Sequence, residues 1–200
     1  MATAISIERN DSAPLGIAPP SGEPSKHYEI VNDQIVEEPP LGAREVFIAT
    51  TISFLLNQFV RGKRLGRVVN EGLFILQAEP RLRRSPDVAF VSDGRWPLTK
   101  PVLSSAAWDV VPDLAVEVIS PSDLSGDIQT KIAEYFRVGV RLVWVVHPYQ
   151  AEIYVYESAR AVKILGYDET ADGGVVLPGF QMPLTEIFET EADEPTADPA

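Results

Sequence analysis

The segment that most constrains the fold is the ten-residue run from Pro112 to Pro121, Pro-Asp-Leu-Ala-Val-Glu-Val-Ile-Ser-Pro. Its apolar, β-branched centre predicts a buried strand, and a proline limits that strand at each end. Glu117 stands in the middle of the run, where an unpaired buried carboxylate would cost far more free energy than its packing returns. The strand therefore either exposes a wet face at Glu117, or this carboxylate holds a metal ion or a proton.

An acidic residue from another strand is a better partner for Glu117 in binding one ion than the acidic residue of its own strand. Asp113 shares a strand face with Glu117 but lies roughly 13 Å away, so one ion cannot bind both carboxylates on a straight strand. The earlier segment Ser85-Pro-Asp-Val-Ala-Phe-Val91 repeats the Pro-Asp pair before an apolar run. Asp87 is therefore the natural partner of Glu117. With no cysteine and only two histidines, carboxylate oxygens indicate Mg²⁺ or Mn²⁺ rather than Zn²⁺.

The order of the predicted elements indicates an α/β fold, a mixed sheet flanked by two helices. We expect a helix over 44–61, with Gly62 near its C-terminal cap, and a second helix around 128–136 that Gly139 ends. The strands and turns are expected at 28–36 (a hairpin), 66–69, 72–76, 87–91, 114–119, 142–146, 152–156, 161–165, 175–177 and 184–188 (one docking turn).

The two ends of the chain differ in composition from its middle. Residues 1–27 are rich in Pro, Ser, Gly and Ala and predict a disordered leader, and residues 189–200 predict a disordered acidic tail. One domain is expected over 28–188. The formal net charge of −12 comes from both ends. No run has the length of a signal peptide core or a membrane span, so we expect a soluble, cytoplasmic protein without a membrane partner.

Basic residues cluster between positions 61 and 84. Such a cluster can meet nucleic-acid phosphates, and it can equally be a solvated face. Three of these residues directly precede Asp87, and we take them as candidate DNA contacts: Arg81, Arg83 and Arg84.

A lysine on the second helix is the candidate third member of the site. Lys131 lies three residues after Ile128 and four before Tyr135, so it borders the helix face that meets the sheet. A cation there could orient a metal-bound water and stabilise a phosphoryl transition state. The alternative is an ordinary surface lysine. We assign Tyr135 to the core.

These segments, in this order, resemble the Uma-two family of restriction-endonuclease-like proteins, within the PD-(D/E)XK nuclease superfamily. The resemblance spans about 28–188 and rests on Ser85-Pro-Asp-Val, on 112–121, on the Asp127, Lys131, Tyr135 and Gly139 series, and on Val143-Trp-Val-Val146. It implies a core of helix, three strands, helix and strand, and Mg²⁺-dependent cleavage of DNA with Asp87 and Glu117 as metal ligands.

The chain departs from the superfamily pattern at one position. That pattern places a lysine two residues after the acid, and here Ile119 stands there, so the basic role moves to Lys131. Glu45 could match the acid of the superfamily's first helix, and Asp113 could support the site or cap its strand.

Three functions remain open from the sequence. The first is a metal-dependent DNA endonuclease, for which a homodimer would suit the cutting of two strands. The second is a catalytically inactive nuclease fold that serves as an interaction or nucleic-acid-binding module, which the acidic ends and Ile119 favour. The third is a phosphoesterase acting on small substrates.

Overall fold

The computed structural model describes residues 27–102, 104–121 and 123–188. Apart from His27, the predicted leader and tail lie outside the described residues. The chain forms the following elements in order: β1 (Tyr28–Val31), β2 (Gln34–Glu37), α1 (Ala43–Lys63), β3 (Gly66–Asn70), β4 (Phe74–Gln77), β5 (Leu82–Arg84), β6 (Val88–Ser92), β7 (Leu114–Val118), α2 (Ser125–Val138), β8 (Leu142–His147), β9 (Glu152–Ser158), β10 (Ala161–Leu165), β11 (Thr170–Gly173), β12 (Leu177–Pro183) and the 3₁₀ turn η1 (Leu184–Glu186).

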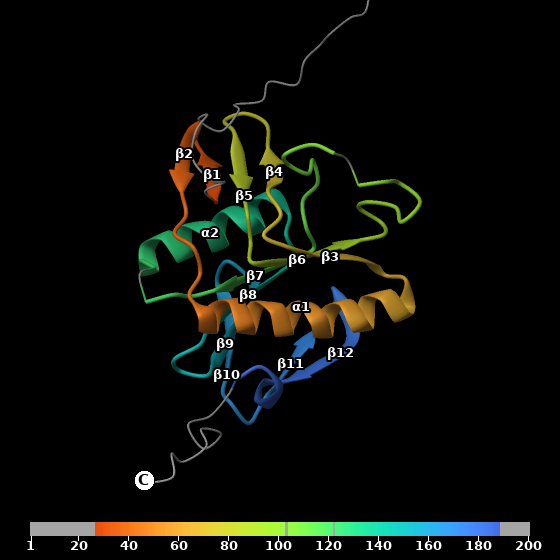
Figure 1. The fold of residues 1–200 in the computed structure, drawn as a ribbon, viewed down its shortest axis with the longest axis vertical. Helices are drawn as coiled ribbons and strands as arrows, with labels where there is room; N and C mark the ends of the chain where they lie inside the picture. Colours follow the sequence, from red (N-terminus) through yellow and green to blue (C-terminus); the bar gives the residue numbers. More distant parts are fainter. Residues whose placement is uncertain (1–26, 103, 122, 189–200) are drawn as a thin grey trace, which may run out of the picture.

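A six-stranded mixed sheet forms the centre of the molecule, in the order β10-β9-β8-β7-β6-β3. Strands β7 and β8 are parallel, with α2 as their crossover, and the other neighbours in this sheet are antiparallel. Figure 1 shows α1 and α2 on opposite sides of the sheet. This arrangement confirms the predicted α/β class and its restriction-endonuclease-like order of helix, three sheet strands, helix and strand.

The alternation of side chains along β7 decides which helix each residue meets. Leu114, Val116 and Val118 pack in the apolar core with α1, whereas Ala115 lies in the separate core with α2. Glu117 has the same parity as Ala115 and therefore points toward α2. A carboxylate in this buried strand is thus directed at the helix that carries Lys131.

Two smaller sheets pack beside the central sheet, one on the α2 side and one on the α1 side. The sheet in the order β2-β1-β5-β4 contributes Phe74, Leu76 and Leu82 to the core on the α2 side. Strand β5 was not predicted, because its sequence, Leu-Arg-Arg, is mostly charged. The prediction that 175–177 extends the main sheet is wrong: β12 pairs with β11 in a separate ribbon that packs on the α1 side.

The two helices end in different ways. Gly139 ends α2 in the left-handed conformation (φ 102°), as predicted. Helix α1 ends within Arg61–Arg64, as predicted, with Gly62 in its last turn and Arg64 in the left-handed cap position (φ 54°). Of the helices described, none is long and apolar enough to cross a membrane.

Candidate active site

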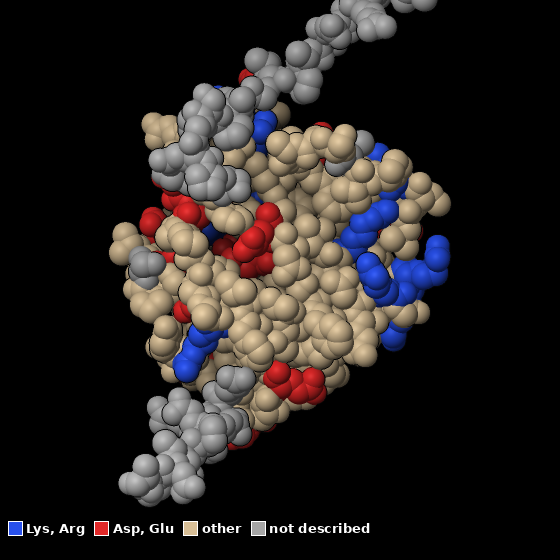
Figure 2. Space-filling model, viewed as in Figure 1, with Lys and Arg blue, Asp and Glu red and all other residues tan. Residues whose placement is uncertain are grey.

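A cavity of about 180 Å³ opens where the end of β7 meets the start of β6, the connection from β2 to α1, and α2. Five carboxylates line it, against the two basic side chains His27 and Lys131; the acids are Glu38, Glu71, Asp87, Glu117 and Asp123. Figure 2 shows acidic side chains gathered in a hollow above α1. The local excess of negative charge makes this cavity a cation-attracting site.

Asp87 enters the cavity from the residue before β6. Because β6 runs antiparallel to β7, its start lies beside the end of β7, and the Asp87 Oδ2 atom accepts a hydrogen bond from the Val118 N–H at 2.6 Å. Burial and the nearby charge of Glu117 raise the pKa of Asp87 to about 8, although the Val118 hydrogen bond opposes that rise. Without a cation, ionising this carboxyl is therefore unfavourable at neutral pH.

Glu117 occupies the centre of the cavity floor and is only 5% exposed. The Tyr135 hydroxyl donates a hydrogen bond to Oε1 at 2.5 Å, and Lys131 Nζ lies 3.5 Å from Oε2. Burial raises the pKa of Glu117, while the attraction of Lys131 lowers it. Tyr135 lies in the core, as predicted, and it also fixes the orientation of this carboxylate.

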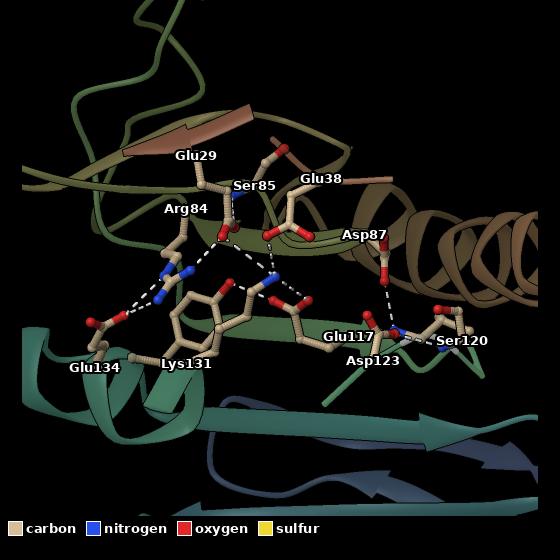
Figure 3. A network of polar contacts seen from close by, with 12 residues as sticks. Glu29, Glu38, Arg84, Ser85, Asp87, Glu117, Ser120, Asp123, Lys131 and Glu134 are labelled. Carbon is tan, nitrogen blue, oxygen red and sulfur yellow. Dashed lines mark hydrogen bonds and ion pairs between the residues drawn. The ribbon is translucent and has the colours of Figure 1, made fainter. Parts of the chain in front are cut away.

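Lys131 reaches the cavity from α2 with its side chain largely buried (11% exposed). Its ammonium lies 3.5 Å from Glu29, 3.3 Å from Glu38 and 3.5 Å from Glu117 (Figure 3). Burial lowers the pKa of Lys131, but the attraction of these carboxylates outweighs burial and raises it above the ordinary value. Lys131 is therefore a fixed cation, and the structure brings it together with Asp87 and Glu117.

Sequence reasoning missed two glutamates that surround Lys131. Glu29 is fully buried in β1; burial raises its pKa, but Lys131 and Arg84 outweigh burial and lower it. Glu38 follows β2, and burial together with a hydrogen bond to Glu29 raises its pKa to about 7. The signal for Glu29 was available, because it is also a glutamate within an apolar strand.

The predicted DNA contact at Arg84 is not supported by its position. Arg84 is 5% exposed and pairs with Glu29 and with Glu134, the latter at 2.5 Å. Glu29 also accepts the Ser85 N–H at 2.9 Å, so this buried pair fixes the segment leading to Asp87 (Figure 3). A guanidinium held in this way is not available to phosphate.

The other two predicted contacts lie on the same strand or next to it. Arg81 precedes β5 and forms an ion pair with Asp33 at 2.7 Å. Arg83 is partly exposed, with a buried Nε atom that has no hydrogen-bond partner among the described residues. Neither residue lines the acidic cavity.

Asp113 and Glu45 do not line the cavity either. Asp113 is 1% exposed, accepts the Ser92 N–H at 2.7 Å and pairs with Arg95 at 2.8 Å and Arg141 at 2.7 Å. It therefore ties β6 and the start of β8 to β7. Glu45 is buried in the first turn of α1, and its Oε1 has no hydrogen-bond partner among the described residues.

The residues present fit a hard divalent cation. Asp87 and Glu117 are two carboxylates whose charges repel each other in a buried setting, and Lys131 divides its charge among three glutamates. Among the described residues, no three His, Cys, Asp or Glu side chains form a metal-binding group by themselves. A cation here would therefore take main-chain or water oxygens as well, which is how Mg²⁺ is usually held.

Comparisons with known proteins agree with this architecture. The model of the Uma2 family, described as "Putative restriction endonuclease", matches residues 18–185. The crystal structure of a "putative nuclease belonging to DUF820" from Anabaena variabilis superposes with a TM-score of 0.70 at 16% identity, covering 80% of this chain and 89% of that one. At that identity the likeness shows the fold alone. None of the curated proteins matches this chain.

Proposed function

Since the chain belongs to the Uma2 (Uma-two) family, we propose that it is a metal-dependent nuclease that hydrolyses DNA phosphodiester bonds in the Asp87–Glu117–Lys131 cavity. The observation that carries this proposal is the convergence of two mutually repelling carboxylates and one buried lysine in the same cavity. The comparisons support a nuclease; the metal and the DNA substrate are parts of the proposal.

Asp87 and Glu117 would hold Mg²⁺ or Mn²⁺, with the main-chain carbonyl near Val118 as a further oxygen donor. When bound, the ion lowers the pKa of water and neutralises charge on the scissile phosphate. The Val118 N–H and the Tyr135 hydroxyl each hold one carboxylate oxygen, so the two acids are fixed in position. This preorganisation avoids rearrangement when charge develops.

Lys131 would orient the attacking water and stabilise the charge that develops on the phosphoryl group. The three glutamates around its ammonium prevent it from swinging away, because leaving them would expose a buried negative charge. Glu38, with a pKa of about 7, lies on the open side of this cluster. It can therefore exchange a proton with the cavity near neutral pH.

A second candidate function is nucleic-acid binding without cleavage. The observation in its favour is Ile119, which lines the cavity two residues after Glu117, where the superfamily pattern has a lysine. If Lys131 cannot replace that lysine, the fold would bind its ligand without turnover.

A cleavage assay separates these functions. Wild-type protein with Mg²⁺ or Mn²⁺ and plasmid or linear DNA should give products, and Asp87→Ala, Glu117→Ala and Lys131→Ala should each lose about 100-fold or more of that activity. Asp109→Ala removes an exposed carboxylate outside the cavity and should match the wild type.

Three results would contradict the proposal. Equal activity in all variants would place the reaction elsewhere. Tight DNA binding without cleavage would support the binding module. Hydrolysis of a small phosphodiester such as bis(p-nitrophenyl) phosphate, with intact DNA, would indicate a phosphoesterase.

A further inference from the structure

A second hollow, of about 470 Å³, lies at the other end of α1. It is bounded by the last turns of α1, by strand β3, and by the segment after β6. Strand β3 forms an edge of the six-stranded sheet, so the hollow follows a strand with one free side. Figure 2 shows basic side chains gathered around this end of α1, on the same face as the acidic hollow. A ligand lying on this face could contact both hollows.

Two arginines on the rim are available for a ligand. Arg61 and Arg64 are exposed, and within the described residues their guanidinium groups make no hydrogen bond or ion pair. With Asn57 they recur at spacings of four and three residues, so they project from one side of α1 and its cap. Arg64 has φ 54°, a conformation that favours glycine or asparagine. An arginine in this conformation lowers the stability of the fold, and it places a cation at the rim of the hollow.

The opposite wall of the hollow is fixed by hydrogen bonds. Arg67 uses its guanidinium to donate hydrogen bonds to the carbonyls of Trp96, Pro97, Leu98 and Lys100 at 2.9–3.3 Å. These bonds tie the loop to β3. Trp108 also lines the hollow; it is 8% exposed, and its indole N–H has no acceptor among the described residues. Its ring contributes apolar surface to this wall of the hollow.

This combination of groups favours a ligand that is both anionic and partly planar. Two free guanidinium groups and the Asn57 amide match a phosphate, while Val68, Leu98 and Trp108 offer an apolar surface to a base. An extended peptide could also add to the free edge of β3, but it would leave the two arginines without a counter-charge. The observations therefore favour a nucleotide unit over a peptide.

The distance between the two hollows sets the number of nucleotides that would separate them along one ligand strand. Val46 lines the acidic cavity and Arg61 lines the second hollow; the two lie fifteen residue steps apart on α1, which is about 22 Å of helix at 1.5 Å per residue. A DNA strand in a duplex advances about 3.4 Å per nucleotide, so about six or seven nucleotides separate the two points.

We propose that the Arg61–Arg64–Trp108 hollow is an anchoring subsite for one nucleotide of the nucleic-acid substrate, about six or seven nucleotides from the acidic cavity. The inference that the ligand is nucleic acid rests on the proposed nuclease function. The inference that the hollow binds an anion rests on Arg61, Arg64 and Asn57, which line it.

The test measures binding without cleavage, by fluorescence anisotropy of a labelled 20-nucleotide DNA, single-stranded and duplex, in EDTA. Arg61→Gln combined with Arg64→Asn removes both charges and keeps a residue that tolerates positive φ. The matched control, Arg160→Gln with Lys163→Gln, removes two exposed charges at the β9–β10 hairpin. Trp108→Phe keeps a ring and removes the donor.

The hollow variant should bind roughly 10- to 100-fold more weakly than the wild type, and the slope of log affinity against log salt should fall by about one, since one phosphate contact is lost. The control should stay within about twofold in affinity, and so should Trp108→Phe, because the lost N–H is buried and an apolar ring remains.

The outcomes separate the two proposals. If the hollow variant binds as tightly as the control while the wild type cleaves DNA, the subsite is refuted and the nuclease stands. If binding depends on Arg61 and Arg64 but no DNA is cleaved under any metal condition, the nuclease proposal fails and the subsite stands. If the wild type binds neither form of DNA, the subsite is refuted.

Discussion

Replacing Asp87 with asparagine should stabilise the metal-free protein while it abolishes cleavage. The amide oxygen of asparagine can still accept the Val118 N–H that Asp87 accepts at 2.6 Å. What disappears is the charge that burial and Glu117 oppose. A substitution that improves stability and removes activity at the same position is the behaviour of a functional carboxylate.

The size of the effect follows from the pKa of Asp87, about 8 in the folded protein against 3.8 ordinarily. Because the folded state binds this proton more tightly, the carboxyl lowers the free energy of unfolding progressively as pH rises from about 4 to 8. At 1.36 kcal/mol per unit, the penalty at pH 7 reaches at most about 4 kcal/mol. Water on the open side of the cavity reduces this to roughly 1–3 kcal/mol.

Thermal unfolding in EDTA across pH 4–8.5 measures this effect. The variant should melt roughly 3–10 °C above the wild type at pH 8 and match it near pH 4, where both forms are neutral. In Mg²⁺ at 100 times the dissociation constant, the wild type should gain about 2.7 kcal/mol and the variant almost nothing. Asp93→Asn, which alters an exposed carboxylate that accepts the Leu98 N–H, should change stability by about 0.5 kcal/mol or less.

One result would refute this reasoning. If Asp87→Asn lowers the melting temperature at pH 8 without metal, the charge of Asp87 stabilises the fold. Asp87 would then be a structural residue that joins the ends of β6 and β7, and the cavity would have lost one of its two proposed metal ligands.

Three further predictions test the remaining assignments. Arg84→Ala should cost roughly 3–5 kcal/mol in urea unfolding because the buried Glu29 loses its closest cation and keeps only Lys131, at 3.5 Å. Arg81→Ala, at an exposed pair, should cost about 1 kcal/mol or less; equal costs would contradict the assignment of Arg84 as a structural residue. Asp113→Ala should destabilise the fold by roughly 2–4 kcal/mol, yet the protein that remains folded should keep its Mg²⁺ affinity in calorimetry. Loss of that affinity would show that Asp113 contributes to the metal site. Mg²⁺ affinity of the wild type should rise from pH 6 to 8.5, because the ion displaces a proton held on Asp87 up to about pH 8; calorimetry in buffers of different ionisation enthalpy should show proton release, and a flat profile would argue against this ligand.

Most of the fold prediction depended on apolar patterns within single segments. Most strands, both helices and the stop at Gly139 follow from local periodicity and turn residues, which depend on neighbours within a few positions, whereas β5 and β11 were not predicted. The errors also come from this reliance on residues close in sequence. Strand β5 is short and charged, and its buried Arg84 is accommodated by partners far away in sequence, Glu29 being 55 residues away. Nothing local signals such a partner.

The sequence by itself determined that a carboxylate lies within the buried strand of residues 114–118 and that another opens a neighbouring strand, because strand periodicity and the cost of a buried charge are local properties. Only the tertiary structure decided which cations and acids meet them. It turned Glu117 toward α2, brought Glu29 of β1 and Glu38 after β2 around Lys131, and buried Arg84. It left the guanidinium groups of Arg61 and Arg64 without a partner among the described residues. Charge pairing depends on distance in space and on exclusion of water, and folding sets both of these between residues that the sequence keeps far apart.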